Sequence, residues 1–168
     1  MYEKFGEFNS AEQINERAAE LKAAGDTDGL KILVKENGID NDDYNDYING
    51  ELDELTTPLL AALGKIKVES NDLKIGGTLA DWVKELEEAV SVDPEIAKAV
   101  RKKHKSLAGY IAATADYGYS HRTKVDKRIV DKCPEIKKVI GNHPFEIGIP
   151  DKLQRKKLMK EYYLGGKS

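Results

Sequence analysis

Apolar residues in the first half of the chain recur every three or four positions, and glycine or proline separates one group from the next. This spacing buries one side of an α-helix. Ser10 and Gln13 form a capping box that predicts a helix start, and Gly25, Gly38 and Gly50 are placed to end three successive helices. The side chains expected to face inward on these helices are Ile14, Ala18, Leu21, Leu30, Leu33, Val34, Tyr44, Tyr47 and Ile48.

Proline directly after a capping side chain predicts two more helix starts, at Thr57-Pro58 and at Asp93-Pro94. Residues 70–77 are expected to connect the first of these helices to a helix that Thr78 caps and Trp82 anchors in the core. The expected apolar stripe after Pro58 consists of Leu59, Leu60, Leu63 and Ile66.

The last third of the chain predicts more helices and one short extended segment. Small and aromatic residues between Ser106 and Tyr119 indicate a closely packed, buried helix. A short helix is expected over 125–133, halted by Pro134, and Asp151 is placed to cap a final helix. The expected fold class is mainly α, a compact multi-helix bundle that is either one domain or two small lobes, with at most a short extended segment near residues 145–149.

The formal net charge of −3 hides a strong difference in sign along the chain. Residues 1–95 hold 9 Lys and Arg against 23 Asp and Glu, whereas residues 96–168 hold 18 against 7. We therefore expect an acidic helical part over 1–92 and a basic helical part over 93–168. Each attracts an oppositely charged partner over about 8–10 Å in physiological salt, unless the two parts neutralise each other inside the fold.

The composition is typical of a soluble protein. Hydrophobic residues make up 40% and charged residues 34% of the chain, and the apolar runs are too short to span a bilayer. The first residues do not resemble a signal peptide, and the single cysteine, Cys133, excludes an internal disulfide. We expect a cytoplasmic protein without membrane contact.

The patterns that come closest to a chemical site fail on residue type or spacing. Residues 40–51 have the length of a calcium loop, but Tyr44 replaces an oxygen ligand and Asn45 replaces the required glycine. The three histidines and Cys133 lack the paired spacing of zinc ligands, and no oxyanion motif accompanies Cys133 as a nucleophile. No phosphate-binding loop occurs. We expect no catalytic residue, no metal and no cofactor.

Two sets of charged side chains are candidates for binding a macromolecule. The acidic set lies in and after a helix-turn-helix outline at 30–48, where its charge would repel DNA but suits a protein that imitates nucleic acid. It consists of Asp40, Asp42, Asp43, Asp46, Glu51, Asp53 and Glu54. The basic set would bind phosphates if its helices converge, and would otherwise form separate solvated faces. It consists of Arg101, Lys102, Lys103, Lys105, Arg122, Lys124, Lys127, Arg128, Arg155, Lys156 and Lys157.

Short segments spread over nearly the whole chain form a recognisable set, namely residues 5–12, 36–39, 47–51, 58–65, 81–83, 99–107, 148–150 and 161–165. Together they resemble the PcfK-like proteins of mobile elements in gut Firmicutes. Some members of that family are described as anti-CRISPR proteins, so the resemblance implies an inhibitor of a type II RNA-guided effector nuclease in a bacterial host cell. None of the segments is a catalytic signature.

Such an inhibitor would bind the nuclease or its guide ribonucleoprotein and block the loading of nucleic acid or the recognition of the target. The acidic set would compete for surfaces that hold nucleic acid, or the basic set would contact RNA or DNA directly. The alternative is a nucleic-acid-binding accessory protein of a conjugative or plasmid element, acting through the basic set.

Overall fold

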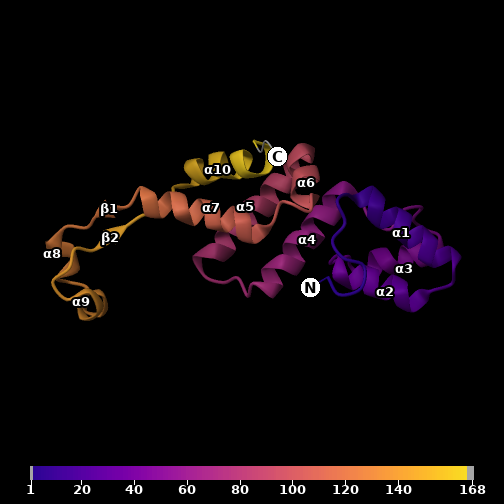
Figure 1. The fold of residues 1–168 in the computed structure, drawn as a ribbon, viewed down its shortest axis with the longest axis horizontal. Coiled ribbons are helices and arrows are strands. Elements are labelled where there is room, and N and C mark those ends of the chain that lie inside the picture. The colour runs from indigo at the N-terminus through magenta and orange to yellow at the C-terminus, as the bar shows by residue number, and fades with distance from the viewer. Residues whose placement is uncertain (1, 166–168) are drawn as a thin grey trace.

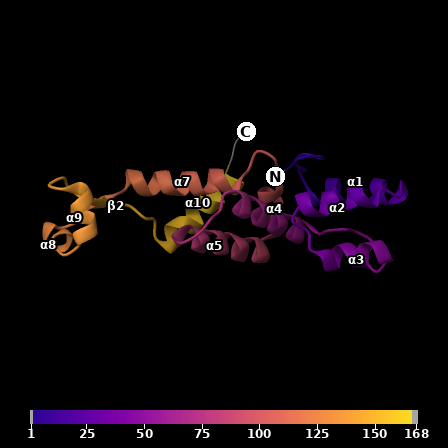
Figure 2. The same ribbon diagram turned by 90° about the horizontal axis from the view of Figure 1, so that it is seen from below.

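The computed structural model describes residues 2–165, which form ten α-helices and one two-stranded sheet. Their bounds are α1 Ala11–Ala23, α2 Thr27–Glu36, α3 Asn41–Asn49, α4 Pro58–Asp72, α5 Thr78–Val92, α6 Pro94–Arg101, α7 Leu107–Ser120, β1 Thr123–Lys124, α8 Lys127–Val130, α9 Pro134–Ile140, β2 Glu146–Ile147 and α10 Lys152–Leu164. The mainly α fold class is confirmed. Helices α1–α3 lie at one end of an elongated molecule, and β1, α8, α9 and β2 lie at the other (Figures 1 and 2).

Helices α1, α2 and α3 form a first hydrophobic core from the side chains that the periodicity placed inward. Leu30 and Leu33 are completely buried, and Tyr47 is almost so. The Asp26 carboxylate accepts the Gly29 amide at 2.7 Å and thereby caps α2. These helices therefore begin and end where local capping chemistry predicted.

Helix α4 belongs to two cores at once. Ala61 packs in the first core, whereas Ala62 and Ile66 pack in a second core built with α5, α6, α7 and α10. The division between the cores therefore runs through one helix and does not coincide with the change of charge near residue 93. Trp82 is buried in α5, as expected, at 5% exposure.

The end of α2 rests directly on the backbone of α4. A Cβ on Gly64 would lie 2.2 Å from the Asn37 carbonyl oxygen, and a Cβ on Gly38 would lie 2.4 Å from the Gly64 carbonyl oxygen. Gly38 also has a φ of +65°, in the left-handed region that favours glycine. This contact fixes the first core, and with it the start of α3, against α4.

A buried ammonium group ties the N-terminal segment and the α6–α7 loop to α4. Lys65 is 1% exposed, and its Nζ donates to the carbonyl oxygens of Lys102 at 2.9 Å and Lys105 at 2.6 Å. The same Nζ forms an ion pair with Glu7. The Lys65 ammonium therefore fixes the backbone of the basic 102–105 loop against α4.

Residues 121–149 form an arm that leaves the molecule between α7 and α10 (Figure 1). In it, β1 pairs with β2 in an antiparallel ribbon, with Thr123 opposite Ile147. At its base the backbones of α7 and the segment after β2 touch, since a Cβ on Gly148 would lie 1.9 Å from the Gly118 carbonyl oxygen. The extended segment expected near 145–149 is therefore one strand of this ribbon.

The expected burial is wrong on one face each of α4 and α7. Leu59 and Leu60 are 37% and 39% exposed because α4 turns Ala61, Ala62 and Ile66 toward the cores instead. Tyr119 is 65% exposed because the end of α7 runs beyond the second core toward the arm.

Several expected boundaries are also wrong. Helix α4 continues to Asp72, and Gly77, not Thr78, occupies the position before α5. The helix expected over 125–133 is shorter, since α8 ends at Val130. Pro134 begins a further helix, α9, because proline suits the first position of a helix. The sequence of β1 does not alternate between apolar and polar residues as a strand pattern would. The strand forms because it pairs with β2.

Candidate functional site

Residues 40–54 contain seven carboxylates and no Lys or Arg. Asp40 lies directly before α3, and the others lie on α3 and on the loop that follows it. Asp43 and Asp46 are half-buried and the other five are exposed. We call this set the acidic surface: Asp40, Asp42, Asp43, Asp46, Glu51, Asp53 and Glu54. The acidic residues expected from the sequence are thus neighbours on one part of the molecule.

Helix α3 carries more carboxylates than the favourable interaction with its helix dipole explains. Asp42 and Asp43 stand in the first turn, where the positive end of the helix dipole favours carboxylates, but Asp46 stands beyond it. Asp40 precedes the helix without capping it, and its carboxylate accepts from Lys67 Nζ at 2.7 Å. Four carboxylates therefore share about 9 Å of helix axis.

The Asp43 carboxyl shows the cost of this crowding. Its pKa is raised, first because half-burial removes water from the charged form and then because Asp40, Asp46 and Asp42 repel it. Within residues 2–165, Asp40 is the one carboxylate of the acidic surface that forms an ion pair, with Lys67. The surface is therefore strongly negative and not neutralised by its own fold.

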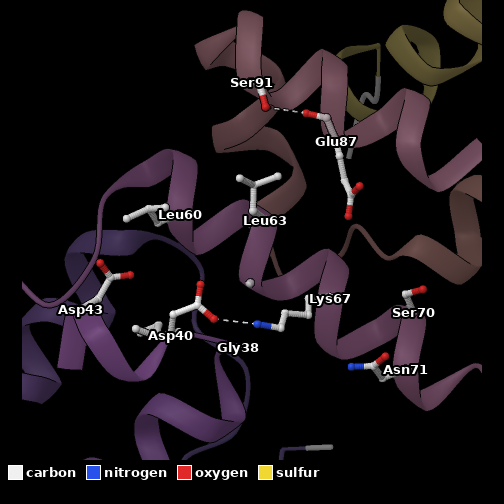
Figure 3. A pocket seen from close by; sticks show the side chains of 12 residues that line it. Gly38, Asp40, Asp43, Leu60, Leu63, Lys67, Ser70, Asn71, Glu87 and Ser91 are labelled. Atoms are coloured by element: carbon white, nitrogen blue, oxygen red, sulfur yellow. Dashed lines mark hydrogen bonds and ion pairs between the residues drawn. The ribbon is translucent and has the colours of Figure 1, made fainter. Parts of the chain in front are cut away.

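A hollow of about 550 Å³ adjoins the acidic surface between the start of α3, α4 and α5 (Figure 3). Asp40 and Asp43 line it from one side, and Glu87 of α5 lines it from the other. Leu60, which is 39% exposed, and Lys67 come from α4. Carboxylates beside an apolar wall suit a long cationic side chain, whose stem packs on Leu60 while its charged head pairs with oxygen.

Lys67 limits the acidic surface on one side. It also lines a second hollow of about 610 Å³, where Lys31 and Lys35 of α2 replace the carboxylates. The acidic surface is therefore a bounded patch and does not cover the whole N-terminal end.

The residues that α4 and α5 contribute to the first hollow, chiefly Leu60, Lys67 and Glu87, were not predicted as site residues. Leu59 and Leu60 carried a signal, because two adjacent leucines followed by Ala61 and Ala62 cannot all face one core. No comparable signal marked Glu87.

The basic set does not converge on one surface. Lys102, Lys103 and Lys105 lie in the α6–α7 loop, Lys156 and Lys157 lie on α10, and the others except Arg101 and Arg155 lie in the arm (Figure 1). Arg101 is 1% exposed and donates to the Asn37 side chain at 2.6 Å. Its assignment to an exposed basic face is wrong, because its helix turns it into the junction between the two cores.

Several other members of the basic set are held by carboxylates nearby. Arg155 forms two hydrogen bonds to Glu85, at 2.6 and 2.8 Å, and these bonds lower the pKa of the Glu85 carboxyl. Arg122 pairs with Glu146 at 2.6 Å, and Arg128 pairs with Asp126 at 3.0 Å. Lys102, Lys103, Lys124, Lys127 and Lys156 have no ion pair among residues 2–165.

The acidic surface and the basic arm lie at opposite ends of the molecule (Figures 1 and 2). These two surfaces therefore do not neutralise each other, although the acidic and basic parts of the chain do pair elsewhere, since Arg155 binds Glu85 at 2.6 Å. Each of these two surfaces carries an excess of one sign of charge.

The described residues form neither a calcium loop, nor a cluster of metal ligands, nor a membrane-spanning helix. Residues 41–49 are helical, so 40–51 is not a calcium loop. Among residues 2–165 no three His, Cys, Asp or Glu side chains come together as metal ligands would, and no helix is both long and apolar enough to cross a bilayer. Cys133 is half-buried, with its Sγ 3.4 Å from the Ile129 carbonyl oxygen.

Comparisons with known proteins give no match. No family model fits the chain, and neither a curated protein nor a solved structure is similar to it. Function must therefore be inferred from the surfaces themselves.

Proposed function

We propose that this protein is a stoichiometric inhibitor of a type II RNA-guided effector nuclease, and that the acidic surface is its contact. The observation that carries the proposal is the set of seven carboxylates over residues 40–54, without an intervening cation, beside a hollow with an exposed leucine. Binding alone would inhibit, because a nuclease whose nucleic-acid surface is occupied cannot recognise its target.

The spacing of negative charges along α3 is similar to the spacing along the nucleic acids that such a nuclease binds. An RNA-guided nuclease holds its heteroduplex in a positive channel and reads a short duplex motif with arginines. Duplex DNA carries one negative charge per about 1.7 Å of axis. Four carboxylates between Asp40 and Asp46, over about 9 Å, give one per roughly 2–3 Å.

The raised pKa of Asp43 supports a binding role over a structural one. Carboxylates that repel one another destabilise the folded state. A single substitution would relieve this repulsion, so stability alone does not explain why these carboxylates are present. A cationic partner would relieve that repulsion on binding.

The hollow gives the contact a geometric element as well as charge. An arginine of the partner can enter it with its stem against Leu60 and its guanidinium toward Asp43, while Glu87 adds negative charge from the opposite side. Neither of these carboxylates forms an ion pair among residues 2–165. Planar, bidentate recognition of carboxylates is the geometry that arginine provides.

Cleavage of target DNA by the nuclease, loaded with guide RNA and mixed with the full-length chain, tests the proposal. We expect cleavage to fall as the molar ratio reaches one, and the triple variant Asp42→Asn, Asp43→Asn, Asp46→Asn to inhibit at least about tenfold less well. A matched variant that removes three exposed carboxylates elsewhere, Asp81→Asn, Glu88→Gln and Asp116→Asn, should inhibit like the wild type. Undiminished cleavage at large excess, for several effector types, would reject the proposal.

A further inference from the structure

The arm contains a hollow of its own, of about 540 Å³, enclosed by β1, α8, α9 and residues 141–145. Lys124, Lys127, Lys137, His143 and one carboxylate, Asp131, line it together with the apolar side chains of Val130 and Phe145. The volume lies within the range of about 300–1,000 Å³ that small organic ligands occupy. Cations next to apolar walls indicate a ligand that is both anionic and partly flat and apolar.

Only some of the lysines that line this hollow form ion pairs within the protein. Asp131 binds Lys137 at 2.9 Å, but Lys124 and Lys127 are exposed and form no ion pair among residues 2–165. Over residues 121–149 the chain has seven Lys and Arg against four Asp and Glu. The excess positive charge therefore remains free for a polyanion.

Folding alone does not explain why the arm projects. Val130 is its one buried apolar residue, while Ile129 is 58% and Val139 is 85% exposed. A two-stranded ribbon is weakly stable by itself, yet the contact of Gly148 with Gly118 holds this one away from the second core. The structure thus presents the hollow to solvent on a fixed base.

The base of the arm offers a second flat surface. Tyr119 is 65% exposed, and the Arg122 guanidinium lies 4.1 Å from the centre of its ring. Exposed aromatic rings beside cations are the usual means by which proteins bind unpaired bases. Tyr119 lies in the last turn of α7, so this stack adjoins the base of the arm.

We propose that the arm binds single-stranded nucleic acid, with one unpaired base in the hollow against Phe145 and Val130 and the flanking phosphates on Lys124 and Lys127. A duplex cannot insert a base without opening, and an acidic peptide would use the lysines but not the apolar walls. The inference is independent of the acidic surface, which lies at the other end of the molecule.

Fluorescence anisotropy of labelled oligothymidylate and oligouridylate with the full-length chain, without any nuclease, tests this inference. We expect binding that weakens steeply between about 50 and 200 mM salt. The variant Lys124→Ala, Lys127→Ala should bind more weakly and should lower the slope of log K against log salt by about 1.4, because each phosphate contact to a single strand contributes about 0.7. Both lysines are exposed, so their loss leaves the fold intact.

Two matched variants locate the site. Lys156→Ala, Lys160→Ala removes two exposed lysines of α10 and should leave the slope unchanged. Phe145→Leu should weaken binding at least about fivefold through lost stacking, whereas Val139→Ala should not weaken it.

Several results would overturn the inference. The first is no salt-dependent binding to either oligonucleotide, and the second is equal binding by the wild type and by the double variant of Lys124 and Lys127. The third is tighter binding of a duplex than of either single strand, and the fourth is binding of free nucleotides but not of the strands. The fifth is displacement of the strand by polyglutamate at equal charge concentration. The last result would assign the surface to an acidic protein partner.

Discussion

Individual charged residues in this protein differ most in the partners that surround them. The Lys65 ammonium is buried and donates to the Glu7 carboxylate and two backbone carbonyls, with the Glu69 carboxylate 3.7 Å away, so every one of its donors is used. The Asp43 carboxylate is half-buried among other carboxylates. The first arrangement makes the charge necessary to the fold, and the second makes it a cost to the fold.

Replacement of Lys65 by methionine should lower the free energy of unfolding by about 3–5 kcal/mol, because the buried Glu69 carboxylate, Glu7 and two carbonyls would lose their cation. Urea denaturation followed by circular dichroism measures the change. The matched variant Lys67→Met, on the same helix, breaks the exposed pair with Asp40 and should cost about 1 kcal/mol or less. Equal losses in the two variants would contradict the role assigned to Lys65.

Replacement of Asp43 by asparagine should raise the free energy of unfolding at pH 7 by about 0.3–1 kcal/mol, a size typical of like-charge contacts. Because folding raises the pKa of Asp43, its ionisation penalises the folded state, and the penalty appears as the pH rises through the carboxyl range. The gain in the variant should therefore vanish below about pH 4. Denaturation at several pH values measures this, and Asp81→Asn, in the first turn of α5, should give no gain.

At the level of elements, the relative positions of helices depend on two places where backbones touch. Gly38 and Gly64 bring α2 against α4, and Gly118 and Gly148 bring α7 against the segment after β2. The first contact positions the acidic surface, and the second positions the arm.

A Gly64→Ala variant should be destabilised by about 1–3 kcal/mol, because its Cβ would overlap the Asn37 carbonyl and push α2 away from α4. Gly76→Ala is the control, since a Cβ there meets nothing within 4 Å and should be neutral or slightly stabilising. Chemical denaturation of both variants measures the difference. A neutral Gly64→Ala would mean that the two helices can separate without cost.

A Gly148→Ala variant should loosen the arm while leaving the two cores intact, because the overlap with Gly118 affects only its base. Hydrogen exchange should become faster over residues 123–147 and stay unchanged in α4 and α5. The neighbouring variant Ile149→Ala, at a side chain that is 63% exposed, should leave the arm protected. Faster exchange throughout the molecule would show that the arm is not a separate unit.

At the level of the whole molecule, two cores share α4 and two oppositely charged surfaces lie far apart. We expect the cores to unfold together, because neither keeps its packing without that helix. Trp82, the one tryptophan of the chain, lies in α5 and reports on the second core. Its fluorescence and the far-ultraviolet circular dichroism should give the same urea midpoint, and two separate midpoints would contradict a shared core.

The sequence by itself determined where most helices begin and most of the residues that face inward. Ser10, Asp26, Thr57, Asp93 and Asp151 each cap the helix that follows. These features depend on hydrogen bonds and side-chain spacing within a few residues, so the local sequence is sufficient to predict them. The acidic surface was predictable for the same reason, since α3 and its loop are contiguous in the chain.

Only the tertiary structure decided which charges remain available to a partner. Arg101 resembled its basic neighbours in the sequence but is buried against Asn37, and Leu60 resembled a core residue but lines a hollow with Glu87. The position of the arm depends on Gly118 meeting Gly148 from across 29 intervening residues. Burial and pairing are set by neighbours that are distant in the chain, and no local pattern contains that information.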